Sequence, residues 1–269
     1  MVIDFHTHIF PDKIADRTIS LLSAKGGICP FSDGKESGLI SKMEDAGVDV
    51  AIALPVLTSP SQFESVLTYA AAINDKYKDE KRRIISFAGI HPDSPDIDGE
   101  MKRVADMGFL GVKIHPDYQG TFIDDERYVR ILERAKEYGL TVVTHAGTDI
   151  AFRGQEVRCT PKRAVNLIRQ VPYSRIVFAH LGGAEMAEEV ITTLAGEDVY
   201  FDTSYVLRDT DRDTFMRILD RHGKDRMLFG SDSPWSDIKG DVEIIKSFSL
   251  KKDEEERIFS RNVRELLGI

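Results

Sequence analysis

The residues of this sequence best able to do chemistry are its histidines, and most of them end a short apolar run. Six of the seven stand at or just beyond the end of such a run: His6, His8, His91, His115, His145 and His180. In a parallel barrel the active site forms at the carboxyl ends of the strands, so residues far apart in sequence converge there. His222 lies between a helical pattern and the next run, and we interpret it as a surface residue.

His6 and His8 are the strongest pair. Two residues apart on a strand, they point to the same face, and Asp4 lies one step deeper on that face. Two imidazoles that face a barrel axis above an aspartate suit a divalent metal ion. Asp232 ends the last apolar run, beside the first strand in a closed barrel, and would add an anionic oxygen ligand. The pattern therefore predicts a metal site.

Other polar residues around these runs leave alternatives open. Lys113 shares a strand face with His115. It could bind an anion, form a salt bridge inside the barrel, or be a carboxylated lysine that bridges two metal ions. Arg153 and Arg158 follow the fifth run and could bind a substrate carboxylate, or could be solvated loop residues. His91 and His115, each followed by proline, fit structural or pocket-lining roles better than metal ligation.

Eight short apolar runs, rich in Val, Ile and Phe and bounded by turn residues, alternate with amphipathic segments along the chain. They are Val2–His8, Val48–Pro55, Ile84–Ile90, Leu110–His115, Leu140–His145, Arg175–His180, Val199–Thr203 and Arg226–Ser231. Alternation of this kind predicts parallel βαβ units. A count of eight, in a chain of 269 residues, favours one α/β domain over 1–269: a single (β/α)₈ TIM barrel, which typically takes about 250 residues.

The segment after the first run is longer than a barrel needs. We expect a helix over Asp12–Ala24, then the Gly-rich loop Gly26–Gly34, and only then the helix that precedes Val48. A long loop insertion after strand 1 would lie over the barrel mouth, where such loops commonly act as lids or specificity elements.

Composition excludes several classes of protein. The net charge is −9 and no block of Lys and Arg offsets it, so we expect neither nucleic acid nor an anionic membrane as a partner. Two cysteines, Cys29 and Cys159, are too few for a disulfide framework. The longest apolar stretch, around Val48–Leu57, is far shorter than a membrane span, and the N-terminus has no signal-peptide pattern. A cytoplasmic location is therefore expected.

Five strand-end motifs together resemble the amidohydrolase superfamily. They are Asp4-Phe5-His6-Thr7-His8, Gly111-Val112-Lys113-Ile114-His115-Pro116, Thr144-His145-Ala146-Gly147, Ala179-His180-Leu181-Gly182-Gly183 and Gly230-Ser231-Asp232-Ser233-Pro234-Trp235. More narrowly they are similar to the amidohydrolase-2 branch, which includes aminocarboxymuconate-semialdehyde decarboxylase. The terminal segment from Asn262 to Gly268 is similar to the C-terminus of that branch. The resemblance runs in order from Asp4 to Gly268.

The resemblance implies a metal, usually zinc, at the strand ends. His6 and His8 match the first-strand ligands, His145 the fifth-strand ligand and Asp232 the eighth-strand aspartate. His180 matches the sixth-strand histidine, which is a ligand in two-metal members and a catalytic acid or base in one-metal members. Members of the branch often form dimers, so the resemblance also implies a homodimer.

The number of metal ions is left open by the resemblance. Lys113 lies on the strand that carries a bridging carboxylated lysine in some members, but its Gly-Val-Lys-Ile-His-Pro context also occurs in one-metal members. The substrate pocket is expected to include Lys113, His115, Arg153 and Trp235. The expected substrate is a small molecule with a carboxylate, which Lys113 and Arg153 would bind.

The mechanism that we expect is metal-assisted hydrolysis of an amide, ester or lactone. One Zn²⁺ would be held by His6, His8, His145 and Asp232, with a water molecule at an open position. Asp232 would take a proton as the water attacks a carbonyl, and His180 would polarise the carbonyl or transfer the proton.

Three other functions use similar residues. A non-oxidative decarboxylase would share the metal ligands. A phosphoesterase of the polymerase-and-histidinol-phosphatase type also opens with a His-x-His strand, but its last strand usually ends in Ser-Asp-x-His, whereas Asp232 is followed by Ser233-Pro234. The third is a non-catalytic barrel that kept its metal. A missing ligand would support it, but every expected ligand is present in the sequence.

Overall fold

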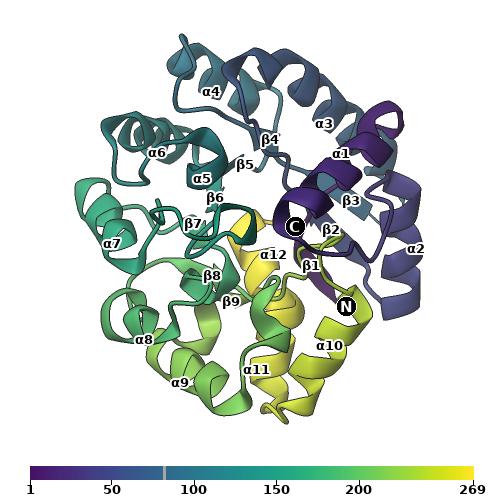
Figure 1. The fold of residues 1–269 in the computed structure, drawn as a ribbon, viewed down its shortest axis with the longest axis vertical. Coiled ribbons are helices and arrows are strands. Elements are labelled where there is room, and N and C mark those ends of the chain that lie inside the picture. Colours follow the sequence, from purple (N-terminus) through teal and green to yellow (C-terminus); the bar gives the residue numbers. More distant parts are fainter. Residues whose placement is uncertain (81–82) are drawn as a thin grey trace.

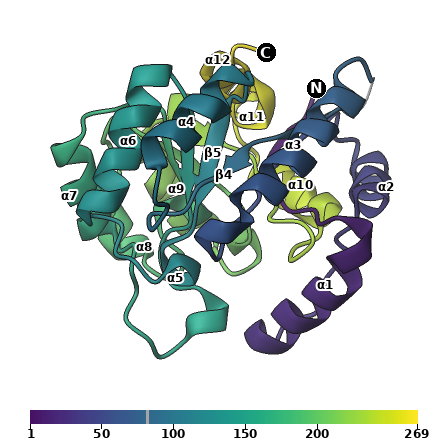
Figure 2. The same ribbon diagram turned by 90° about the horizontal axis from the view of Figure 1, so that it is seen from above.

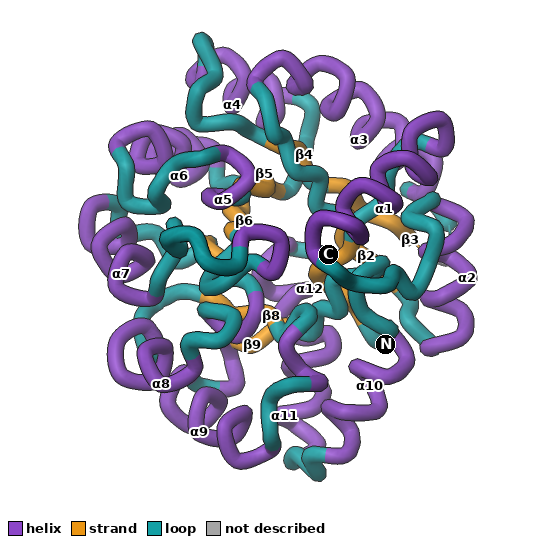
Figure 3. Tube along the Cα trace, in the orientation of Figure 1, coloured by secondary structure: helices purple, strands orange, loops and turns teal. Residues whose placement is uncertain are grey.

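Short parallel strands form the inner layer of the molecule and helices form the outer layer (Figures 1 and 3). The computed structural model describes residues 1–80 and 83–269. Its strands are β1 (Ile3–Thr7), β2 (Val50–Ala53), β3 (Arg83–Ser86), β4 (Ala88–Gly89), β5 (Gly111–Ile114), β6 (Thr141–Thr144), β7 (Ile176–Phe178), β8 (Tyr200–Asp202) and β9 (Met227–Leu228). They pair in parallel in the orders β1-β2-β3 and β4 to β9. Each of the eight predicted runs contains a strand.

Backbone hydrogen bonds continue the strand order where the two sheets end. β3 and β4 are two parts of one predicted strand, interrupted at Phe87, whose N–H donates to Ala53 O at 2.9 Å. On the other side, Phe5 N donates to Phe229 O at 2.8 Å, and Asp232 N donates to His6 O at 2.8 Å. The first and last strands therefore lie side by side, as the predicted (β/α)₈ barrel requires.

Helices surround the strands on all sides in Figure 1. They are α1 (Asp12–Gly26), α2 (Glu36–Ala46), α3 (Phe63–Tyr77), α4 (Ile97–Asp106), α5 (Pro116–Gln119), α6 (Glu126–Tyr138), α7 (Pro161–Gln170), α8 (Ala187–Glu189), α9 (Arg212–His222), α10 (Ile238–Ser247), α11 (Lys252–Glu256) and α12 (Asn262–Leu267). Local chemistry sets several ends. The Thr160 side chain caps α7 by accepting from Arg163 N, and Gly139, with φ of 68°, ends α6.

Alternating side chains of the strands fill the interior of the ring. Phe5, Phe87, Val143, Val177 and Leu228 come from five different strands or strand breaks, are fully buried, and belong to one apolar cluster. Burying each such side chain contributes about 1.5–3 kcal/mol, so this cluster fixes the register of the strands whose ends carry the polar residues.

The segment between β1 and β2 holds two helices, α1 and α2, joined by a loop over residues 27–35. In Figure 2, α1 and α5 lie at the end of the molecule opposite both chain termini. This is the end reached by the carboxyl termini of the strands. No helix in the ranges 1–80 and 83–269 is both long and apolar enough to cross a membrane.

The prediction that His222 is a surface residue is wrong. Its side chain is buried, its ring stacks on Phe201 with centroids 3.7 Å apart, and its Nδ1 accepts a hydrogen bond from Gly196 N at 3.2 Å. Because His222 stands on the inward face of α9, with Phe215, Ile218 and Leu219, it packs against the strand layer instead of facing water.

Candidate metal site

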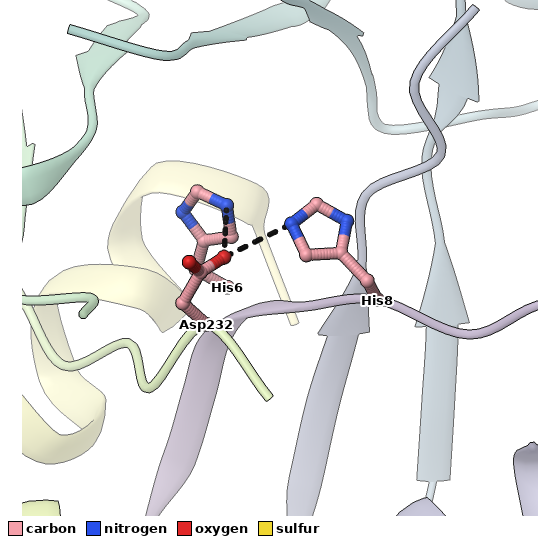
Figure 4. Close-up of side chains that lie close together, drawn as sticks. All are labelled: His6, His8 and Asp232. Atoms are coloured by element: carbon pink, nitrogen blue, oxygen red, sulfur yellow. Dashed lines mark hydrogen bonds and ion pairs between the residues drawn. The ribbon is translucent and has the colours of Figure 1, made fainter. Parts of the chain in front are cut away.

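His6, His8 and Asp232 come together at the carboxyl end of the strands (Figure 4). The distance from Asp232 Oδ1 to His8 Nε2 is 3.0 Å, and that to His6 Nε2 is 3.4 Å. One ligand atom from each of the three residues lies within 4.8 Å of the others, a spacing that could hold a metal ion. His6 is almost fully buried, so these atoms face one another with little access for bulk water.

Hydrogen bonds on the far side of each ring identify which nitrogen carries the proton. His6 Nδ1 donates to the Asp202 carboxylate at 2.7 Å, and His8 Nδ1 donates to the carbonyl of Leu54 at 2.8 Å. A carbonyl or a carboxylate can only accept, so in each neutral ring the proton lies on Nδ1. The Nε2 lone pairs of His6 and His8 therefore point at Asp232 Oδ1. Three electron-pair donors that converge in this way are complementary to a cation.

Buried polar contacts fix the strand ends that carry this group. Asp4 Oδ2 accepts from Ser231 Oγ at 2.6 Å, and Asp4 Oδ1 accepts from Ser231 N at 2.9 Å. Burial raises the pKa of Asp4 to about 7. Asp4 thus ties the first strand to the residue before Asp232, and it acts as a support for the site and not as a ligand in this arrangement.

Two residues at the site have backbone conformations that are rare outside glycine. φ is 60° at His180 and 71° at Asp232. Such left-handed conformations cost on the order of 1 kcal/mol each and persist where the surroundings impose them, often at functional sites. Asp232 N donates to His6 O, which shows how the strand pairing imposes this turn and directs the carboxylate inward.

Lys113, on β5, lies inside the ring next to His6. Its Nζ is 3.2 Å from His6 Nε2, and the side chain is 1% exposed. Burial lowers the pKa of Lys113 to about 8. Burial also lowers the pKa of His6, to about 3, and the charge of Lys113 acts in the same direction. His6 is therefore neutral at physiological pH and keeps its Nε2 lone pair.

His180 and His145 continue a row of rings that starts at His8. Ring centroids are 5.1 Å apart for His8 and His6, 5.5 Å for His6 and His180, and 4.7 Å for His180 and His145. His180 Nδ1 donates to Ser204 O at 2.9 Å, which leaves a lone pair on Nε2 of the neutral ring. That atom lies 3.0 Å from His145 Nδ1. All five histidines and aspartates predicted as ligands or catalytic groups thus share one rim.

A second group of possible ligands consists of His145 and two further residues, His115 and Asp149. The His115 and His145 rings stack at 4.4 Å, and His115 Nε2 is 3.2 Å from Asp149 Oδ2. Within residues 1–80 and 83–269, His145 Nε2 has no hydrogen-bond partner, and neither has Asp117 Oδ2, which lies 3.8 Å from it. The structure thus brings His6, His8 and Asp232 into one group and places His145 in the second group, with His115 and Asp149. The assignment of His145 as a ligand stays a prediction.

The predicted substrate-binding residues are distributed differently around the rim. Arg153 is exposed and pairs with Glu185 at 2.6 Å. Arg158 lies 3.5 Å from Asp117 Oδ1. Trp235 follows the site directly, since its N–H donates to Asp232 O at 2.8 Å. Trp235 therefore lies close to the metal site, whereas Arg153 already has a carboxylate partner.

The sequence reasoning missed Asp202, the carboxylate that orients the His6 ring. Asp202 is fully buried, and Oδ1 accepts from His180 N at 3.0 Å while Oδ2 accepts from His6 Nδ1. Burial raises the pKa of Asp202, but the electrostatic interactions with His6 and His180 and the hydrogen bonds from His6 and Ser204 outweigh it and hold that pKa below its usual range. The signal was available, because Asp202 ends an apolar run, as the histidines do.

Comparison with solved structures gives the same fold at low sequence identity. The chain is similar to 2,6-dihydroxybenzoate decarboxylase complexed with 2,6-dihydroxybenzoate, with 15% identity, a TM-score of 0.73, and 100% of this chain and 99% of that chain covered. It is also similar to 5-carboxyvanillate decarboxylase from Novosphingobium aromaticivorans complexed with manganese and 4-hydroxy-3-methoxy-5-nitrobenzoic acid, with 15% identity, a TM-score of 0.74, and 100% and 96% covered.

A third similar structure has a different reaction in its name. It is a candidate 2-pyrone-4,6-dicarboxylic acid hydrolase from Pseudomonas putida, with 16% identity, a TM-score of 0.68, and 99% of this chain and 97% of that chain covered. No curated protein matches the chain. At these identities the structures establish the fold and not the reaction.

The family follows from the sequence over nearly its full length. The family model described as amidohydrolase matches residues 3–269, a span that includes every strand and every residue of the rim. The order of the motifs, the parallel barrel fold and this match agree, and the chain belongs to the amidohydrolase-2 family of enzymes.

Proposed function

We propose that the protein is a metal-dependent hydrolase that acts on a small, carboxylate-bearing amide, ester or lactone. The observation that carries the proposal is the convergence of His6 Nε2, His8 Nε2 and Asp232 Oδ1 at the end of the barrel that bears active sites in this fold. A divalent metal is expected in this family, and one of the similar structures contains manganese.

The residues fit a divalent metal ion. Two neutral imidazoles and one carboxylate are ligands that zinc and manganese accept, and each imidazole is oriented by an acceptor behind it. Without a cation, the lone pair of His8 Nε2 and the charge of Asp232 Oδ1 would repel each other at 3.0 Å. Among these metals we propose zinc, as the sequence motifs imply.

When bound, the metal would polarise the substrate carbonyl and lower the pKa of a bound water toward about 7. The chain supplies the proton transfers. Asp232 has a second carboxylate oxygen that can accept the proton of the attacking water. His180, fixed by Ser204 through Nδ1, presents Nε2 to the same space and can pass the proton to the leaving group as the scissile bond breaks.

A second metal ion is an alternative that the same rim supports. His145 Nδ1 and His180 Nε2 face each other at 3.0 Å, an arrangement that a shared proton or a cation would stabilise. Lys113 lies beside His6 Nε2, and as a cation it would compete with a metal ion for that lone pair. A carboxylated Lys113 would remove this competition, because it would carry two oxygens that share one negative charge in place of the cation.

Decarboxylation is the second candidate function, and a specific observation favours it: two of the similar structures are decarboxylases of hydroxylated aromatic acids. The same rim residues would hold the substrate carboxylate, and His180 would take a proton from water at Nε2 and deliver it to the carbon that loses carbon dioxide. The remaining expectations are a small-molecule substrate, a homodimer and a cytoplasmic location, and they stay predictions.

The test has two parts. Protein purified without added metal is analysed for bound metal, with His8→Ala as the matched variant; about one equivalent or more in the wild type and a large loss in the variant is the expected result. A panel of lactones, esters, amides and aromatic acids is then incubated in isotopically labelled water. Labelled oxygen from water in a new carboxylate identifies hydrolysis. Labelled hydrogen from water on carbon, with release of carbon dioxide, identifies decarboxylation. Wild-type protein with no more metal than His8→Ala would exclude the proposed site.

A further inference from the structure

A pocket lies beside the metal site, on the side of the last strand. It has a volume of about 270 Å³, and its lining includes Cys29, Phe31, Tyr205, Arg208, Trp235 and Ser236. The first two belong to the Gly-rich segment after α1, and the others follow β8 and β9. Three of the walls are aromatic rings, which favour a flat, apolar occupant.

Backbone hydrogen bonds hold this pocket against the metal ligands. Trp235 N donates to Asp232 O at 2.8 Å, and Tyr205 N donates to Ser231 O at 3.1 Å. The Tyr205 ring lies 6.4 Å from the ring of His180. The pocket and the metal site therefore lie next to each other on the same rim.

Arg208 is the cation of the pocket. Its guanidinium carbon lies over the Phe31 ring, 4.3 Å from the centroid, and Phe31 N donates to Pro234 O at 2.7 Å. On another side, Arg208 Nε is 3.8 Å from Asp241 Oδ1. Asp241 is 1% exposed, and neither of its oxygens has a hydrogen-bond partner in the part of the chain that the structure describes. Phe31 and Asp241 thus restrain the guanidinium on two sides.

The outer nitrogens of Arg208 make no hydrogen bond to any residue in 1–80 or 83–269. An arginine fork held by stacking and by a buried carboxylate is suited to bind a planar carboxylate with two hydrogen bonds. Arg153 and Arg158, the arginines that the sequence suggested for this role, are paired with Glu185 and Asp117 instead.

We propose that the pocket binds an aromatic carboxylate, with Arg208 paired to an acidic group of the substrate that is distant from the reacting bond at the metal site. This deepens the proposed function, on which it rests, by naming a planar substrate with a second acidic group. Asp209 also lines the pocket and carries the opposite charge. Its carboxylate weakens the binding of an anion and so provides a test of opposite sign.

Binding can be measured without turnover because Trp235 is the single tryptophan of the chain and lines the pocket. Its fluorescence is titrated with isophthalate and with isophthalamide, which has the same flat shape and no charge. Arg208→Met is expected to weaken isophthalate binding about tenfold and to leave the affinity for isophthalamide unchanged. Arg208→Lys is expected to bind isophthalate with an affinity between those of the wild type and Arg208→Met, since lysine keeps the charge and lacks the two-pronged guanidinium. Asp209→Asn is expected to strengthen isophthalate binding.

Arg217→Met is the matched control, since it removes an exposed arginine that pairs with Glu188 and lies outside the pocket lining. The proposal is overturned if Arg208→Met binds isophthalate as tightly as the wild type, or if it loses affinity for both probes equally. The outcome is separate from that of the proposed function: the charge-selective loss can occur in a protein that hydrolyses nothing, and hydrolysis can occur in a protein whose Arg208→Met variant binds normally.

Discussion

Replacing Asp202 by asparagine changes hydrogen-bond chemistry with almost no change in shape, yet we expect it to weaken metal binding about 10- to 100-fold. In the wild type, Oδ2 accepts from His6 Nδ1 at 2.7 Å. Oδ1 accepts from the backbone N–H groups of His180 and Ser204, at 3.0 and 3.1 Å. An asparagine has one oxygen that accepts and one nitrogen that donates, so it can satisfy only one of these two sides.

The backbone N–H groups cannot become acceptors, whereas an imidazole can exchange the roles of its nitrogens. The amide oxygen is therefore expected to replace Oδ1, which leaves the amide nitrogen facing His6 Nδ1. His6 must then accept at Nδ1 and carry its proton on Nε2, the atom that faces Asp232 at 3.4 Å. A protonated Nε2 has no lone pair for a metal ion, so the proton must move back to Nδ1 before His6 can bind the metal. A 10- to 100-fold loss of metal affinity corresponds to a free-energy cost of about 1.4–2.7 kcal/mol for this transfer.

Metal affinity is measured by competition with a chromophoric chelator, and thermal unfolding of the metal-free proteins checks the fold. Asp98→Asn is the control, because it removes an exposed carboxylate that pairs with Arg130 far from the site. A folded Asp202→Asn protein that binds metal as tightly as the wild type would show that His6 does not ligate through Nε2, and the tautomer argument would fail.

Three further predictions concern stability. Burial raises the pKa of Asp241 to about 7 from 3.8, so the folded state keeps a proton that the unfolded state releases, and stability falls as pH rises through this interval. Asp241→Asn should remove up to about 4 kcal/mol of this dependence, as seen in urea unfolding across that range. Burial lowers the pKa of His222 to about 4 from 6.5, so stability falls as pH decreases through that interval, and His222→Phe should remove up to about 3 kcal/mol of the fall. Gly147→Ala would place a Cβ 2.1 Å from Ala184 N and should cost more than Gly108→Ala, which has a similar positive φ and open space; equal losses of unfolding free energy would contradict the clash.

Much of the fold could be predicted from the sequence because each buried strand is a short apolar run with a polar residue at its end. The His-x-His spacing was sufficient to place His6 and His8 on one face, and the order of the runs was sufficient to bring Asp232 beside them. These inferences need only local periodicity and the closure of a ring, which do not depend on the details of packing.

What could not be predicted depends on contacts between distant elements. Asp202 looks like any residue at a strand end until the pairing of β8 places it behind His6. Arg208 lies in a segment with no recognisable motif, and only the approach of Phe31 and Asp241 distinguishes it from Arg153. His222 was misjudged because one histidine in a helix does not indicate which face it occupies, and that face is set by the packing of α9 on the strands.

The anchors of the ligand rings link metal binding to the integrity of the barrel. His6 is held by Asp202 of β8, and His8 is held by the carbonyl of Leu54, directly after β2. β1 lies between β2 and the last strand, and the last strand lies between β1 and β8. A shift of register on either side of β1 would therefore turn a lone pair away from the ion. A metal that binds only the native register stabilises it by mass action, by about 4 kcal/mol at 1,000 times the dissociation constant. The same contacts that select the tautomers therefore make the metal-bound barrel more stable than the metal-free one.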